Sequence, residues 1–422
     1  MACLPLAAQA ATRLDYQAGI SYLHSNNITL SDTDRISENV LMPSLDFTMR
    51  QDGSAVQMSV DGSLQYLMFE NDLFKDNLRG DLNGRLNWVI SPERMHWVVE
   101  DYLSEQPVST LSGYSLTNQQ RVNVFVTGPS FFARLSPTTL AQADLRYSDT
   151  YAEDIAAFDG DRYNGAVRVI RELTPNQKFS FNAEATRVRY EGATASFDYD
   201  REDAYVGYEA KSSALDLSLQ AGYTRVEPKG DGDRKSDPLL RAEATWQATP
   251  RSTVHVRASH EYADTTQTLI ADAIVPGAPG VTAPNPNGPL MQVGPDAFRQ
   301  TRFDGDYTYD SERVRFAVQP YYARVHYFNG VDMDQDIHGA LASLDYTLRP
   351  GWRMTAVVSD QRRELNSLDR KDTDRSAGLA LGRDFSRHWI GRVEIQRRER
   401  NSSEPGQSYS ENAVIISFHY RR

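Results

Sequence analysis

The chain has 422 residues, of which 24% are charged, and a formal net charge of −12 at pH 7. No basic face that could neutralise phosphates is apparent, which argues against nucleic acid as a partner. No run approaches the roughly 20 apolar residues of a membrane-spanning helix, which excludes a helical membrane protein. A membrane β-barrel is not excluded, because its alternating strands hide their hydrophobicity from averages.

The first ten residues, MACLPLAAQA, resemble the end of a secretory signal. A short apolar core, residues 4–8, leads to Ala8-Gln9-Ala10, which fits a small-x-small cleavage site, although the basic start of a signal is missing. We therefore predict a partial signal peptide over residues 1–10 and a single domain over 11–422. Cys3, the single cysteine, lies in the leader, so the mature domain has no thiol, which is compatible with an oxidising compartment.

The first predicted strand covers residues 13–24 and is followed by a polar loop, 25–35. The next strand ends at Gln51-Asp52-Gly53-Ser54, and Asp-Gly is a strong signal for a tight hairpin. Strands over residues 56–68 and 78–88 follow, and the second of them leads into the turn at 91–94.

The hairpin over residues 163–190 shows most clearly the unit that the chain repeats. Val167 alternates with Arg168 on its first arm, and Phe181 alternates with Asn182 on its second arm. A period of two places apolar side chains on one face of a strand and polar side chains on the other. A soluble sheet would look the same over one hairpin, but similar hairpins follow one another from about Arg13 to the end of the chain, with no helical stretch between them.

Short turns and longer polar loops alternate along the chain. The longer loops include residues 229–237, 360–375 and 400–408, and the longest, 263–298, has no regular period. About nine short turns imply roughly twenty strands, with both chain ends on the short-turn side. A propeller blade of similar length would need four strands where this chain has two. We predict an all-β fold, a transmembrane antiparallel up-and-down β-barrel of about 18–20 strands with short periplasmic turns and long extracellular loops.

The large aromatic residues gather at opposite ends of the predicted strands. Tryptophans lie beside the short turns and tyrosines lie at the far ends, as two membrane–water interfaces would select, whereas aromatics that close a sandwich core would not segregate. We expect interface positions at Trp88, Trp97, Trp246, Trp352, Trp389, Tyr22, Tyr66, Tyr147, Tyr223 and Tyr262.

The polar face of the strands carries charges of both signs, which an aqueous channel wall tolerates and a dry core does not. A barrel of roughly twenty strands leaves an aqueous channel unless it is plugged. The segment 263–298 is the only one long enough to obstruct it, and long loops of this kind are often functional, which favours partial occlusion. The residues expected to line the pore are Arg79, Asp81, Arg85, Asp144, Arg146, Arg168, Glu184, Arg241, Glu243, Arg257, Arg302, Asp304, Arg315, Arg392 and Glu394.

Catalytic and metal sites are weighed and not favoured. His255 and His260 share a strand with Glu261 and Asp264 near its outer end, and a His–Asp pair could activate water. A histidine on a wet lumen wall is the better interpretation, since no serine motif supports catalysis. The acidic loops 231–233 and 332–336 lack the full spacing of a calcium loop, so solvated surface charge is favoured. We expect no enzyme activity, no metal and no cofactor.

Two short stretches resemble a known family. SYLHSNNITL, residues 21–30, resembles the opening strand and Asn-Ile loop of the outer-membrane β-barrel porin family associated with exopolysaccharide and exosortase (PEP-CTERM) loci. Residues 409–412 before the last strand, with the arginine-rich stretch 396–400, resemble the end of that family. One departure is that Tyr420 is followed by Arg421 and Arg422, where such barrels usually end on an aromatic residue.

The resemblance implies a barrel in the outer membrane of a Gram-negative bacterium that assists polysaccharide export, with no catalytic residues to carry over. We therefore predict a channel surrounded by outer-membrane lipid and served by a periplasmic or inner-membrane export partner. One alternative is a general diffusion porin for small polar solutes. The other is a barrel that serves as a platform for a surface enzyme or adhesin. Cargo, oligomeric state and gating are left open by the sequence.

Overall fold

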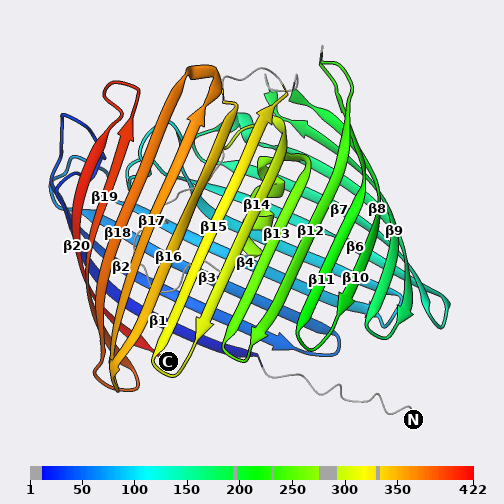
Figure 1. Ribbon diagram of the computed structural model, residues 1–422, viewed down its shortest axis with the longest axis horizontal. Helices are drawn as coiled ribbons and strands as arrows, with labels where there is room; N and C mark the ends of the chain where they lie inside the picture. Colours follow the sequence, from blue (N-terminus) through cyan, green and yellow to red (C-terminus); the bar gives the residue numbers. More distant parts are fainter. Residues whose placement is uncertain (1–11, 193–196, 231, 275–291, 329–332) are drawn as a thin grey trace, which may run out of the picture.

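A computed structural model describes residues 12–192, 197–230, 232–274, 292–328 and 333–422, so the predicted signal peptide lies outside the described residues. These residues form a closed barrel of 20 strands (Figure 1). The first ten strands are β1 (Arg13–Ser25), β2 (Glu38–Asp52), β3 (Val56–Phe69), β4 (Asn77–Ser91), β5 (Met95–Gln106), β6 (Gln120–Ser136), β7 (Thr139–Ala152), β8 (Gly160–Thr174), β9 (Gln177–Tyr190) and β10 (Tyr199–Lys211). The others are β11 (Leu215–Pro228), β12 (Lys235–Thr249), β13 (Ser252–Asp264), β14 (Ala297–Asp310), β15 (Val314–Tyr327), β16 (Gln335–Arg349), β17 (Trp352–Leu365), β18 (Arg370–Asp384), β19 (Trp389–Ser402) and β20 (Tyr409–Arg421).

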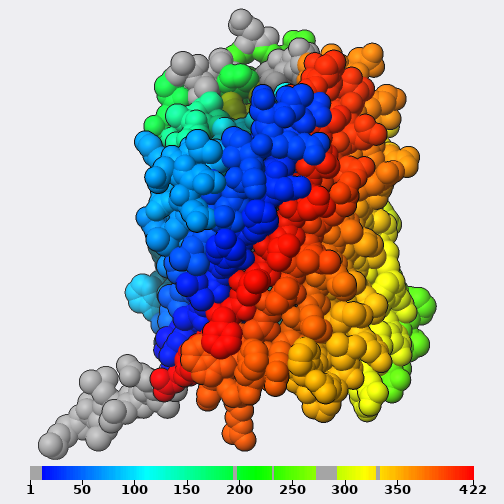
Figure 2. Space-filling model, turned by 90° about the vertical axis from the view of Figure 1, so that its left-hand side faces the viewer, coloured from blue at the N-terminus to red at the C-terminus, as the bar shows by residue number. Residues whose placement is uncertain are grey.

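Each strand pairs antiparallel with the next one along the chain, for example β8 with β9 in the hairpin described above. The barrel closes where β1 pairs with β20, from Gln17 opposite Arg421 to Ser25 opposite Ala413. Figure 2 shows these two strands, blue and red, lying side by side in a continuous wall. The predicted up-and-down barrel of 18–20 strands is confirmed.

The period of two places apolar side chains on the outside of the wall. Val167 and Phe181 are 56% and 60% exposed, and they alternate with the half-buried Arg168 and Asn182. Asn182 donates a hydrogen bond to Ser180 at 2.9 Å on the same face. Exposed leucine, isoleucine, valine and aromatic side chains recur in this way around the barrel and form an apolar outer surface. Only a closed sheet can present such a surface to lipid, because it has no unpaired edge.

Short connections lie at the lower end of the barrel in Figure 1, together with the start of β1 and the end of β20. The β16–β17 connection is Pro350-Gly351, and Gly351 has φ +76°, a conformation that glycine adopts without steric cost. Proline followed by glycine at positive φ is the signature of a type II turn. The β16–β17 turn is one of the short turns that alternate with longer connections along the chain.

The polar stretch 360–375 is not a long loop, and that prediction is wrong. Strand β17 continues to Leu365 and β18 begins at Arg370, so the connection is residues 366–369, which contain the 3-10 helix η3 (Asn366–Leu368). The physical reason is that outward positions here are charged. Asp360 pairs with Arg375 at 2.9 Å, and charge on both faces of a strand hides the alternation that marks it. The loops predicted at 229–237 and 400–408 are likewise shortened, by the first residues of β12 and the last residues of β19.

The prediction that no helical stretch interrupts the strands is also wrong. Helix α1 (Thr265–Ile274) follows β13 directly, and a 3-10 turn, η1 (Ala156–Phe158), lies between β7 and β8. Asp264 begins α1, because its Oδ1 accepts a hydrogen bond from the Gln267 amide at 2.9 Å, which is the geometry of an N-cap. Among the described residues, no helix is both long enough and apolar enough to cross a membrane.

Candidate channel and its constriction

Ion pairs cover the inner face of the barrel wall. Asp144 lies 3.4 Å from Arg146 and 3.5 Å from Arg168, and Arg168 in turn lies 4.0 Å from Glu184 on the next strand. These side chains alternate with the exposed apolar residues, so they lie on the opposite, inner face. Each of these four side chains has a partner of opposite charge beside it, which suits a wall that meets water.

The predicted pore-lining residues are mostly brought together in such pairs. The partner lies either on the neighbouring strand or two residues away on the same strand. These are the nearest residues on one face of a sheet. The pairs are Arg85–Glu100 at 3.2 Å, Glu243–Arg257 at 3.7 Å, Arg302–Asp304 at 2.7 Å and Arg392–Glu394 at 3.1 Å, while Arg241 pairs with Glu261 and Asp81 accepts from the Glu105 amide at 3.3 Å. Arg315 is exposed opposite Asp345, and Arg79 is buried against a loop described below.

The predicted interface aromatics lie mainly on the outer surface. Trp88, Trp246, Trp389, Tyr22, Tyr66 and Tyr223 are exposed, and Trp97, Trp352 and Tyr147 are half-buried. Trp97 lies directly opposite Trp88 across the β4–β5 pair. Tyr262 differs from the rest, because it is buried in a cluster with Val188, Tyr190, Tyr199, Val226 and Ala297.

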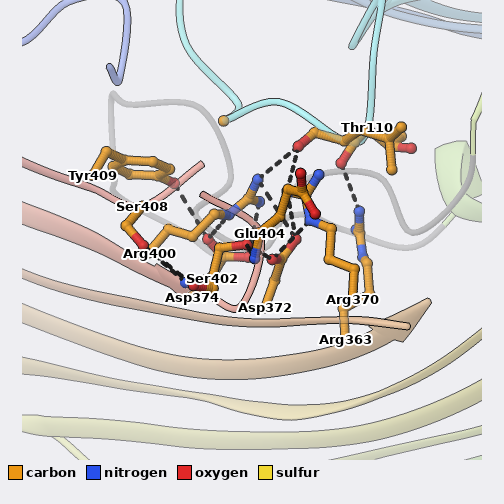
Figure 3. A network of polar contacts seen from close by, with 12 residues as sticks. Thr110, Arg363, Arg370, Asp372, Asp374, Arg400, Ser402, Glu404, Ser408 and Tyr409 are labelled. Atoms are coloured by element: carbon orange, nitrogen blue, oxygen red, sulfur yellow. Dashed lines mark hydrogen bonds and ion pairs between the residues drawn. The ribbon is translucent and has the colours of Figure 1, made fainter. Parts of the chain in front are cut away.

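The β5–β6 loop, residues 107–119, crosses the lumen. Four arginines on β17, β18 and β19, on a distant part of the wall, bind its backbone carbonyls. Figure 3 shows three of them, Arg363, Arg370 and Arg400. These contacts are Arg363 Nη1 to Thr110 O at 2.8 Å, Arg370 Nη2 to Leu111 O at 2.7 Å, Arg400 Nη1 to Leu111 O at 3.3 Å and Arg398 Nη1 to Tyr114 O at 2.9 Å. On the near wall, Arg79 binds the carbonyl of Leu116 and the side chain of Gln119. The loop is thus fixed at both ends of its path.

Carboxylates hold the arginines of the distant wall in place. Arg370 lies 2.8 Å from Asp372, and Arg400 lies 2.7 Å from Asp374, whose carboxylate also accepts from the Tyr409 hydroxyl. Buried charges of this kind are tolerated when they are paired and hydrogen-bonded. The arginine side chains are therefore positioned before they meet the loop.

The inner face is apolar where the loop covers it. Leu116 of the loop packs in a buried cluster with Ile28, Val40, Leu67 and Ile415, on the inner face near the β1–β20 junction. This differs from the uniformly polar lumen that the alternation predicts. The reason is that these positions contact the loop rather than water, so apolar contact stabilises the loop where it lies.

Tyr114 is a further residue of the loop, and its side chain is half-buried. Burial raises the pKa of its phenol well above the usual range, so the hydroxyl stays neutral at physiological pH. It donates a hydrogen bond to the Glu105 carbonyl at 3.3 Å. The residue therefore adds packing to the constriction without adding charge.

The described part of the segment 263–298 also lies in the lumen. It narrows the channel there, as the length of the segment led us to expect. Leu269 of α1 packs against Val122 and Ala152, and Ile270 packs against the neighbouring inner side chains of β5 and β6. Ala152 faces inward, because its neighbour Tyr151 is exposed on the outside. Residues 275–291 of this segment lie outside the described residues.

The two infolded segments are joined to each other and to the wall. Gln292 donates to the Val108 carbonyl at 2.8 Å and accepts from the Thr110 amide at 2.9 Å. At the start of α1, Arg162 of β8 pairs with Asp264, and Arg201 of β10 donates to the Tyr262 carbonyl at 3.0 Å. The loop 107–119 and the segment around α1 therefore form one constriction at the end of the barrel opposite the short turns (Figure 1).

The His–Asp pair weighed from the sequence is not formed. Asp264 pairs with Arg162 instead, and His255 lies 2.9 Å from Glu243. His260 contacts Thr301 at 2.8 Å and lies 3.4 Å from a different aspartate, Asp237, which also pairs with Arg299. Of the acidic loops, Asp231 and Asp332 lie outside the described residues, and Asp336 pairs with Arg324. In the described part of the chain, no group of three histidine, cysteine, aspartate or glutamate side chains could hold a metal ion.

The arginines that hold the loop are not predicted from the sequence, because Arg363, Arg370 and Arg400 are assigned to polar loops and Arg398 to the arginine-rich stretch 396–400. A signal was nevertheless present. Arg370, Asp372 and Asp374 recur with a period of two, as do Arg398 and Arg400. Such a period predicts one face of a strand even where the residues are charged.

No known family model matches the chain, and no curated protein matches it either. Solved structures with a similar course of the chain include OccAB4 of Acinetobacter baumannii, with 9% identity over 99% of this chain and 100% of that one and a TM-score of 0.39. The siderophore receptor PirA of Pseudomonas aeruginosa has 12% identity over 98% of this chain and 81% of that one, with a TM-score of 0.45. The FrpB iron transporter of Neisseria meningitidis has 9% identity over 97% and 81%, with a TM-score of 0.46. Similarities at this level carry no information on substrate.

Proposed function

We propose that this barrel of the Gram-negative outer membrane is a passive channel for small polar solutes. The observation that carries the proposal is the contrast between the two faces of the wall. The outer face is apolar, and the inner face is lined by ion pairs such as Arg85–Glu100 and Arg302–Asp304. A wall of this kind stabilises a water-filled path through lipid, and barrels of 16 to 18 strands already leave such a path.

The constriction favours small solutes over a polymer. A polysaccharide would have to pass the loop 107–119, which arginines of β17–β19 hold across the lumen, and α1, which lies against β5 and β6. Polysaccharide export, which the family resemblance implies, requires both segments to move aside. It remains a prediction, as does the periplasmic or inner-membrane partner that it would need.

Single-channel recording in planar lipid bilayers tests the proposal. We expect ohmic steps in potassium chloride, and we expect liposomes that contain the protein to swell in small sugars but not in large dextrans. Steps that are blocked by purified exopolysaccharide would favour export instead. A barrel without conductance would contradict both channel functions, and hydrolytic activity that is lost on His255→Ala would then support the surface enzyme.

A further inference from the structure

Arg363 carries a buried charge that no carboxylate neutralises directly. Its side chain is 4% exposed, and Nη1 donates to the Thr110 carbonyl at 2.8 Å. Nε has no hydrogen-bond partner, and no carboxylate within the described residues lies within ion-pair distance of this guanidinium. A buried charge normally has an ionic partner, because a neutral carbonyl only partly offsets the loss of water.

The surroundings of Arg363 have an excess of positive charge. Arg370 pairs with Asp372 and Arg400 pairs with Asp374, which leaves three guanidinium groups for two buried carboxylates (Figure 3). Glu404, which Figure 3 also draws, is exposed. Both carboxylates are already engaged, since Asp372 also accepts from Ser402 and Asp374 also accepts from Tyr409. The cluster therefore carries one positive charge in excess, which one bound anion would neutralise.

The loop supplies oxygen atoms where that anion would bind. The Thr110 carbonyl accepts from Arg363, and the Leu111 carbonyl accepts from both Arg370 and Arg400. Consecutive carbonyl oxygens thus face three guanidinium groups. A carboxylate or phosphate also presents more than one acceptor oxygen, and its charged oxygens accept hydrogen bonds about twice as strong as those of a neutral acceptor.

We propose that Arg363, Arg370 and Arg400 form an oxyanion-binding site that the carbonyls of Thr110 and Leu111 occupy in the narrow state of the channel. A solute with a carboxylate or phosphate group competes with the loop for these arginines. Its binding releases the loop from the distant wall and widens the constriction. The proposal rests on the proposed channel function and extends it by naming anionic solutes as those that widen the constriction.

Binding of inorganic phosphate and of acetate to the purified barrel tests the site separately from conductance. The informative variant replaces residues 109–117 by two glycines, which removes the competing carbonyls. We expect isothermal titration calorimetry to show that phosphate or acetate binds at least about tenfold more tightly to this variant than to the full chain. The reason is that, without the competing carbonyls, a larger fraction of the barrels has its arginines free to bind the anion. Binding of phosphate alone indicates phosphorylated solutes, and binding of both indicates carboxylates as well.

In the same shortened background, Arg363→Gln should weaken binding by about tenfold or more, since it removes a charged hydrogen-bond donor. The matched control is Arg362→Gln, because Arg362 is the next residue along β17, is exposed and lies 3.8 Å from Asp360. Folding of each variant is checked by its mobility in unheated gels. The proposal is overturned if the shortened barrel binds neither anion, or if Arg363→Gln binds them as tightly as Arg362→Gln does. Binding without conductance would contradict the channel and leave the site intact.

Discussion

Arg363 donates a hydrogen bond at 2.8 Å to the carbonyl of Thr110, a residue 253 positions earlier in the chain. The contact joins strand β17 to the loop after β5 across the inside of the barrel. It makes the interior of the barrel a folded structure rather than an open tube. Four predictions follow from this interior and from the wall around it.

Removal of Arg398 should destabilise the barrel. Arg398 pairs with the buried Glu411 at 2.6 Å and holds the Tyr114 carbonyl, so Arg398→Gln leaves a buried carboxylate without its cation. We expect a loss of about 3 kcal/mol in the free energy of unfolding. The measurement is the temperature at which the folded band is lost on gels. Arg397→Gln is the control, because its pair with Glu399 is exposed and contributes below about 1 kcal/mol. An equal loss of stability in Arg398→Gln and Arg397→Gln would show that the buried Arg398–Glu411 pair does not stabilise the barrel more than an exposed pair does.

Gly128 should not tolerate a side chain. It has φ +154°, and a Cβ there would lie 2.0 Å from the Leu145 carbonyl oxygen. We expect Gly128→Ala to cost about 2 kcal/mol or to lower the yield of folded barrel, measured by refolding into detergent micelles. At Gly165, a Cβ would meet only the Leu145 side chain, at 3.6 Å, so Gly165→Ala should fold like the parent chain. A fully folded, equally stable Gly128→Ala would show that the backbone relaxes at this position.

A charge on the side of α1 that faces the barrel wall should displace the helix. Leu269 packs against the buried Val122 and Phe158, so Leu269→Asp would place a carboxylate in an apolar contact. We expect larger single-channel steps and faster cleavage of the segment by added protease. Ala271→Asp is the matched control, because Ala271 is exposed on the same helix. If Leu269→Asp changes neither the single-channel conductance nor the rate of protease cleavage, then α1 does not narrow the channel.

The two faces of the wall should report different surroundings. Spin labels at Val167 and Phe181, on the outer face, should be accessible to oxygen dissolved in lipid. Labels at Arg168 and Asn182 should instead be accessible to a water-soluble nickel complex, because they face the lumen. The measurement is power saturation in liposomes. The opposite result would overturn the membrane placement of the barrel and the channel with it.

The wall could be predicted from the sequence, because a period of two is a local property. Val167 and Arg168 fall on opposite faces whatever the rest of the chain does. The number of strands followed from the regular spacing of turns such as Pro350-Gly351. Strand ends were less accurate, since Asp360 and Arg375 carry charge on the outer face and weaken the contrast between the faces.

The constriction could not be predicted in the same way. The partners of the loop 107–119 are on β17–β19, and no local pattern indicates which distant arginines bind a loop through its backbone carbonyls. A carbonyl acceptor is present at every residue, so it leaves no mark in the sequence. Helix α1 is short and depends on contact with β5 and β6, which is again a tertiary effect.

The ties across the lumen also set an order of assembly. The carbonyls of Thr110, Leu111 and Tyr114 are made early in synthesis, but the arginines that bind them come 253 to 289 positions later. Contacts of such long sequence separation form late, because the intervening chain must be ordered first. The interior can therefore form only after the wall is almost complete, so a barrel stalled midway would have a wider lumen than the finished one.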